Sequence, residues 1–174
     1  MNEVLINNWN SVVDKDSTVF HLGDFAWGGF KQWKEVRDRL NGHIILIKGN
    51  HDIKNLTSTA EKELFDYVTQ QMYLRIEGRQ VYLNHFPFLC YGGTYRSPED
   101  VVYQLYGHVH SGQFSKGGRD LPRMIHAFPT QYDVGVDNNH FTPISWRYVD
   151  IKIQNQIKEN EVGKEIEEET GTAH

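Results

Sequence analysis

The sequence predicts a mixed α/β fold in which helices alternate with strands and one sheet contains an antiparallel pair. Short apolar segments with the length of strands alternate with longer segments whose apolar residues have helical spacing. Residues 73–76 and 80–83 are strand-like and flank Glu77-Gly78-Arg79, a spacing typical of a β-hairpin. Because a hairpin joins antiparallel strands, the sheets cannot all be parallel.

The N-terminal segment is predicted to be an amphipathic helix. Its apolar residues fall roughly on one helical face: Val4, Leu5, Trp9, Val12 and Val13. The chain is therefore expected to begin inside a helix, without a strand before it.

Two strands of buried character follow this helix. Residues 18–22 form the first and end at Gly23-Asp24, and residues 43–48 form the second and end at Gly49. The second run lacks polar alternation, which indicates a strand that is covered on both faces. Between the two strands, the apolar spacing over residues 33–40 predicts a helix.

Shorter elements are expected in the second half of the chain. Ser58 and Glu61 have capping-box spacing and should open a helix. Residues 101–106 and 133–136 read as short buried strands, and residues 111–123, which are rich in Gly, Lys and Arg, indicate an exposed loop.

The domain is expected to cover residues 1–154. From Lys158 onward the chain is mostly Glu, Lys, Gly and Thr, and residues 165–169 are nearly all acidic. Such a composition buries little apolar surface, so residues 155–174 are predicted to form a disordered tail.

Composition narrows the class of protein. The 174 residues suit one domain, and the formal net charge of -5 without a basic block argues against a generic nucleic-acid binder. A single cysteine, Cys90, excludes an intramolecular disulfide and a zinc site made of thiolates. No apolar run is long enough to span a bilayer, so no membrane is expected, and cytoplasmic is the default location. No pattern in the sequence indicates a protein partner.

Four predicted strands share one feature: polar residues of the types that bind metals follow each of them at once. These residues are Asp24, Asn50, His51, His85, His108 and His110. In open α/β sheets, sites form beyond the carboxyl ends of the strands. We therefore expect separate lengths of chain to bring these groups to one edge of one sheet.

The residue types form a coherent ligand set for a divalent cation. Carboxylate, amide oxygen and imidazole suit Mn, Fe or Zn. A carboxylate has two oxygens and can bridge two metals, and two-metal sites clamp the attacking and leaving oxygens of a phosphate ester. A metal also lowers the pKa of a bound water, so the pattern predicts hydrolysis of phosphomono- or phosphodiesters by a metal-activated water.

Each residue taken alone has an ordinary alternative explanation. His85 would be a core histidine, and Gly49-Asn50-His51-Asp52 would satisfy simple turn chemistry. His108 and His110 would be two surface histidines. It is their occurrence together, in order and each after a strand, that favours a metal site.

In these four motifs the sequence resembles the calcineurin-like metallophosphoesterase family, specifically its small single-domain bacterial and phage members. The motifs are Gly23-Asp24, Gly49-Asn50-His51-Asp52, Asn84-His85 and Gly107-His108-Val109-His110, and the resemblance covers residues 1 to about 150. It implies a four-layer αββα sandwich of two mixed sheets between helices. It also implies two divalent metal ions, with Mn2+ expected first.

The resemblance implies a role for each candidate ligand. Asp24 would bridge both metals, Asn50, His85 and His108 would complete the ligands of the second metal, and His110 would bind the first.

The resemblance also implies two catalytic residues that are not ligands. His51 would face the substrate, stabilise the developing charge and protonate the leaving oxygen. Asp52 would orient His51 and hold its imidazolium.

One part of the family pattern has no counterpart in this sequence. The first strand of the family ends in Asp-x-His, which binds the first metal, and no Asp-x-His occurs here. The domain is thus expected to lack its first strand, with Met1 as an internal methionine of a longer reading frame and one metal in place of two. The alternative function is a catalytically impaired one-metal or metal-free remnant that acts as a binding protein.

The substrate is expected to be a small phosphate ester, with nucleotides among the candidates. Arg96 is a tentative phosphate contact, since Arg binds phosphate in a bidentate manner, although an exposed loop arginine explains it equally well. His21 is expected to be a core histidine, with a replacement ligand as the alternative, and His126 to lie in a loop.

Overall fold

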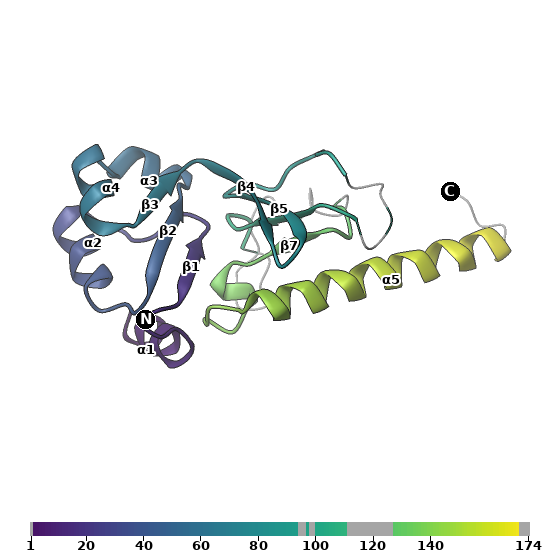
Figure 1. Ribbon diagram of the computed structural model, residues 1–174, viewed down its shortest axis with the longest axis horizontal. Helices are drawn as coiled ribbons and strands as arrows, with labels where there is room; N and C mark the ends of the chain where they lie inside the picture. The colour runs from purple at the N-terminus through teal and green to yellow at the C-terminus, as the bar shows by residue number, and fades with distance from the viewer. Residues whose placement is uncertain (1, 94–96, 98–99, 111–126, 171–174) are drawn as a thin grey trace.

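Seven strands form two sheets in the described part of the chain (Figure 1). The structure is a computed structural model that describes residues 2–93, 97, 100–110 and 127–170. One sheet is entirely parallel and the other is mixed, which confirms the mixed α/β class that the sequence predicts.

The parallel sheet contains β1 (Thr18–His21), β2 (His43–Ile47) and β3 (Tyr67–Thr69), with β2 in the centre. Ile44 and Leu46 of β2 pack into one core cluster, whereas Ile47 packs into another. Side chains alternate between the faces of a strand. The expectation that this strand is covered on both faces is therefore confirmed.

Three helices cover one face of the parallel sheet: α1 (Asn2–Val12), α2 (Phe30–Arg37) and α4 (Ser58–Leu64). Trp33 of α2 is 1% exposed and packs in the cluster that also holds Trp9 and Leu64. The cap of α4 is Thr57, whose hydroxyl accepts from Ala60 N, and not Ser58. This difference of one residue is a common one at helix ends.

The helix at the N-terminus is confirmed, but its buried face differs from the expected one. Val4 and Val12 are exposed, at 55% and 56%, while Ile6, Trp9 and Val13 are buried. The indole of Trp9 donates to Asn41 O at 2.9 Å, which fixes the side of α1 that faces the sheet. Tertiary packing thus selects a narrower stripe than the apolar residues alone indicate.

The mixed sheet contains β4 (Gln71–Ile76), β5 (Arg79–Asn84), β6 (Tyr103–Tyr106) and β7 (Gln131–Asp133), in that order. β4 and β5 form the predicted hairpin, and Glu77 and Gly78 have φ angles of 46° and 90° in its two-residue turn. β6 and β7 pair in parallel. The strand expected at 133–136 is shifted, because Val136–Asn138 is a 3-10 helix.

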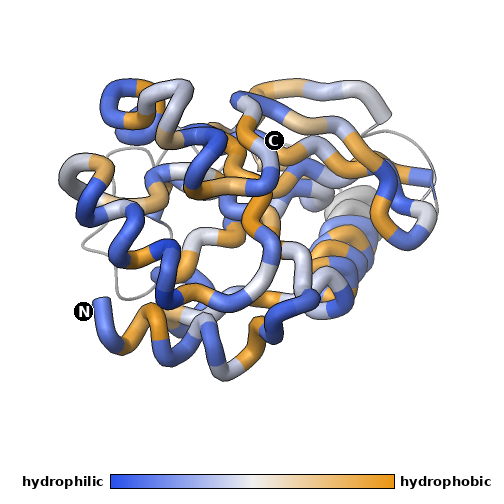
Figure 2. Tube along the Cα trace, turned by 60° about the vertical axis from the view of Figure 1, so that its left-hand side comes forward, coloured by the Kyte–Doolittle hydropathy of each residue, from blue (hydrophilic) through white to orange (hydrophobic). Residues whose placement is uncertain are grey.

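The long C-terminal helix α5 (Trp146–Thr170) packs its first half on a core that both sheets share (Figure 1). Val149, Ile153 and Ile157 recur every four residues and are buried. In Figure 2 hydrophobic and hydrophilic stretches alternate along α1 and α5, as expected of helices that bury one face. In the described residues no helix is long and apolar enough to cross a membrane.

The predicted boundary at residue 154 and the disordered tail need correction. Ile157 lies beyond that boundary and is buried in the core, and the chain is helical to Thr170. Glu and Lys, which dominate the tail, are good helix formers. A charged composition predicted disorder, but a helix already anchored by three buried residues extends through it.

Candidate metal centre

Four of the predicted ligands lie just after strands, as the sequence predicts. Asp24 follows β1, Asn50 opens α3 (Asn50–Asn55) after β2, His85 follows β5, and His108 follows β6. These strands belong to both sheets, so the expectation of one edge of one sheet is wrong. The site lies where the ends of the two sheets meet.

Asp24, His85 and His108 form the cluster that could hold a cation. One ligand atom from each lies within 4.8 Å of the others. His85 Nε2 is 3.2 Å from His108 Nδ1, 3.2 Å from Asn50 Oδ1 and 3.5 Å from Asp24 Oδ2. His85 is only 2% exposed, whereas Asp24 and His108 are half-buried. The cluster thus has a buried floor and an open side.

The hydrogen bond on the other ring nitrogen of His85 fits this ligand set. Nδ1 lies 2.7 Å from Leu22 O, and a carbonyl oxygen can only accept, so Nδ1 carries the proton of the neutral ring. The Nε2 lone pair then faces the oxygens of Asn50 and Asp24, which are also acceptors. A cation at this point would satisfy all of them, and a carbonyl partner is the usual support of a metal-binding histidine.

Backbone conformation at the cluster is costly and is held by close packing. Asp24 and His108 have φ angles of 55° and 67°, in the left-handed region that residues other than glycine rarely adopt. A Cβ at Gly49 would collide with Asp24 Oδ1, and one at Gly23 would lie 2.5 Å from Gly49 N. Such conformations persist where the surroundings enforce them, often at functional sites.

Asp52 has a different position from the one expected. It is fully buried, and its carboxylate accepts three backbone N–H groups: Asp24 N at 2.7 Å, Gly49 N at 2.8 Å and Phe25 N at 3.0 Å. In the described structure these bonds, rather than a contact with His51, satisfy the carboxylate. Asp52 therefore ties the loop after β1 to the loop after β2, which makes it a positioning residue.

His51 lies beside the cluster without joining it. Its backbone N–H donates to Asp24 Oδ1 at 2.9 Å, and its ring Nε2 is 3.9 Å from Asp24 Oδ2. The imidazole is 36% exposed, and its ring centroid is 4.4 Å from that of Trp27. The imidazole thus lies on the open side of the cluster, outside the set of candidate ligands.

His110 does not join the cluster. Its side chain is 68% exposed, and Nδ1 lies 3.3 Å from Asp137 Oδ2, which belongs to the 3-10 helix after β7. No local signal in the sequence connects Asp137 to His110, so sequence reasoning missed this pair. Residues two apart on a regular strand face the same side, but His108 and His110 both have positive φ, so the chain turns at these residues.

His21 remains a core residue in the structure. Its ring packs near Phe25 and Trp9, with centroids 5.3 Å and 6.4 Å away, and in the described residues its Nδ1 has no hydrogen-bond partner. Burial lowers the pKa of His21, while the charge of Asp52 opposes that shift. Arg96 and His126 lie outside the described residues.

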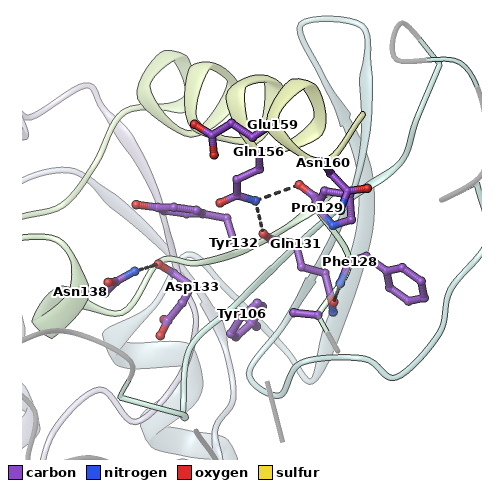
Figure 3. A pocket seen from close by; sticks show the side chains of 11 residues that line it. Tyr106, Phe128, Pro129, Gln131, Tyr132, Asp133, Asn138, Gln156, Glu159 and Asn160 are labelled. Carbon is purple, nitrogen blue, oxygen red and sulfur yellow. Dashed lines mark hydrogen bonds between the residues drawn. The ribbon is translucent and has the colours of Figure 1, made fainter. Parts of the chain in front are cut away.

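A pocket of about 560 Å³ is lined by residues of β7 and α5 (Figure 3). Its lining includes Tyr106, Tyr132, Asp133, Gln156 and Glu159 but none of the four ligands. The side chain of Gln156 crosses it and donates to Pro129 O and Gln131 O, so it holds α5 against the sheet.

Comparisons with known proteins give two relatives whose names state no activity. The chain is 30% identical over 159 residues to the Gene 66 protein of Mycobacterium phage L5, covering 76% of this chain and 72% of that protein. It is also 44% identical over 54 residues to the uncharacterized protein MJ1445 of Methanocaldococcus jannaschii, a segment that spans 31% of that protein.

One solved structure is similar along most of the chain. It is the protein of unknown function AQ665 from Aquifex aeolicus, with a TM-score of 0.62 and 26% identity over 86% of this chain and 83% of that one. No family model matches.

Proposed function

We propose that this chain, which belongs to the same family as the Gene 66 protein of Mycobacterium phage L5, is a metal-dependent phosphoesterase that hydrolyses phosphomono- or phosphodiesters. The single observation that carries the proposal is the convergence of Asp24, Asn50, His85 and His108 from two sheets on one point. The same motifs resemble those of calcineurin-like metallophosphoesterases, whose four-layer αββα sandwich is the finer fold that we propose for this chain.

Asp24, Asn50, His85 and His108 would hold a divalent cation, with Mn2+ the first choice and Fe or Zn as alternatives. Such a cation neutralises phosphate charge and lowers the pKa of water, so that hydroxide is available near neutral pH. The protein contributes the arrangement of these donors. The Leu22 carbonyl fixes the tautomer of His85, and Asp52 fixes the backbone of Asp24.

His51 is the proposed general acid. In hydrolysis a water oxygen bonds to phosphorus, the bond from phosphorus to the leaving oxygen breaks, and the leaving oxygen needs a proton. The imidazole of His51 lies beside Asp24, is 36% exposed and would donate that proton. The proton that the attacking water loses would then protonate the imidazole again. Its place next to the cluster but outside the ligand set supports this role.

The direct test is hydrolysis of bis(p-nitrophenyl) phosphate with and without Mn2+. Wild-type protein should release nitrophenol only with metal, and His85→Ala should lose at least about 10²-fold of that rate, because the buried ligand is gone. His140→Asn is the matched control, since His140 is exposed and its φ of 55° suits asparagine. Equal metal-dependent rates for wild type and His85→Ala would sink the proposal.

The second candidate function is ligand binding without turnover by a one-metal protein. The observation that favours it is the position of His110, which pairs with Asp137 rather than with the cluster. Metal content after purification separates the two candidates when it is measured beside the hydrolysis assay. One metal per chain without turnover would favour binding, and two metals per chain would exclude this candidate.

A further inference from the structure

An exposed tryptophan lies on the side of the candidate site where the leaving group would depart. Trp27 is 76% exposed, and its ring centroid is 4.4 Å from that of His51. A general acid must come within about 3 Å of the oxygen that it protonates. The group that carries that oxygen therefore lies within reach of the Trp27 indole.

The loop that carries Trp27 is anchored on the protein side. Two residues earlier, Phe25 packs edge-on against Phe65 with centroids 5.0 Å apart, and its N–H donates to Asp52 Oδ1. Two residues later, Gly29 is the N-cap of helix α2, and its N–H donates to Gln32 Oε1 at 3.1 Å. Trp27 is thus presented to solvent between two fixed points.

A second aromatic ring lies on the ligand side of the cluster. Phe86 has ring centroids 4.9 Å from His85 and 4.7 Å from His108, and it is 41% exposed. The segment that carries it is held by Gln104, whose Nε2 donates to Phe86 O and whose Oε1 accepts from Phe88 N. In the described contacts Phe86 thus borders two of the proposed ligands, whereas Trp27 borders the proposed general acid.

On this geometry we propose that Trp27 is a specificity residue that stacks on a planar aromatic leaving group, with a nucleoside as the substrate class. The proposal rests on the phosphoesterase function above and names its substrate. A sugar alone would leave the indole in water, whereas a nucleobase would cover it. Base stacking on aromatic side chains is tolerant of sequence and strong enough to decide affinity.

The test compares two substrates with the same leaving oxygen. Adenosine 5′-monophosphate and ribose 5-phosphate both release phosphate from a 5′ oxygen, and their methyl phosphate diesters form a second pair. Wild type should favour the adenosine member through KM, and Trp27→Ala should raise that KM about tenfold or more while changing the ribose member little. Trp27→Phe should restore part of the preference.

Equal losses for both substrates in Trp27→Ala would overturn the proposal, because they would mean that Trp27 only supports the ring of His51. Equal rates for both substrates in wild type, with no effect of Trp27→Ala, would overturn it as well. In either case the hydrolysis itself would stand, so the phosphoesterase function would survive.

A binding measurement decides the matter even without turnover. In EDTA, adenosine 5′-monophosphate should quench tryptophan emission, after correction for absorption, whereas ribose 5-phosphate should not. Trp27→Phe should remove the quench and Trp146→Phe should keep it, because Trp146 packs against Tyr103, with centroids 6.0 Å apart. Quenching in EDTA, combined with no hydrolysis in the separate assays with Mn2+, would reject the phosphoesterase and keep the stacking site. Absence of quenching would overturn the stacking site.

Discussion

The two halves of the candidate metal site differ in how firmly the fold holds them. In the inner half, His85 is buried, its tautomer is fixed by Leu22 O, and Asp24 is braced by Asp52. In the outer half, His110 is 68% exposed, and its described partner is Asp137. Metal sites depend on residues that orient their ligands. In the described residues the inner half is both buried and oriented, whereas His110 has Asp137 as a partner but stays exposed.

The difference teaches that the predicted ligands do not form one unit in this chain. Asp24, Asn50, His85 and His108 converge from both sheets, so their arrangement is set by how the sheets meet. His110 directly follows Val109, which is 2% exposed, yet its own side chain is 68% exposed. We expect the inner half to bind one cation alone.

The largest expected effect is the loss of the inner half. Asp24→Ala removes the carboxylate of the cluster and should weaken Mn2+ affinity by at least about 10²-fold in calorimetric titration. Asp38→Ala is the matched control, because Asp38 is exposed and pairs with Lys34 on a helix surface. Unchanged affinity in Asp24→Ala would break the contrast between the halves.

The second-largest effect is expected at low pH, which should release the cation from the inner half. Protons compete with the cation for imidazole nitrogens, so affinity falls as pH decreases and recovers as pH increases. Metal occupancy measured by elemental analysis after dialysis should be high near neutral pH and lost at about pH 4. Occupancy that remained constant across this range would point to ligands other than His85 and His108.

A substitution of Asp52 distinguishes its role in holding the backbone from a role in holding the His51 imidazolium. Asp52→Asn places an amide N–H against backbone N–H groups in a fully buried site, which should lower the free energy of unfolding by about 3 kcal/mol. Chemical denaturation measures this, with Asp38→Asn as the exposed control. The metal affinity should fall with it, whereas a residue that only held the His51 imidazolium would leave both nearly unchanged.

The smallest effect is expected in the outer half. His110→Ala should lower metal affinity and hydrolysis by less than about tenfold and change unfolding free energy by no more than about 0.5 kcal/mol, because the side chain is exposed. Metal analysis should give one ion per wild-type chain. If wild type bound two ions per chain and His110→Ala bound one, the outer half would hold a metal as firmly as the inner half, and the proposed difference between them would be wrong.

Much of the fold followed from local sequence signals. Hydrophobic periodicity identified α1, β1, β2 and the hairpin of β4 and β5, because each pattern depends on near neighbours. The extent of the C-terminal helix was missed, because the composition after Lys158 argued for disorder and because Val149, Ile153 and Ile157 are buried only by contact with distant strands.

By itself the sequence determined which residue types follow which strands, and hence the chemistry of the candidate site at Asp24, Asn50, His85 and His108. Only the tertiary structure decided their partners. Asp52 bonds to Asp24 N, 28 positions earlier, and His85 bonds to Leu22 O, 63 positions earlier. Such contacts depend on how two sheets pack, and no local pattern encodes them, so the bracing of one half and the exposure of the other appear only in the folded chain.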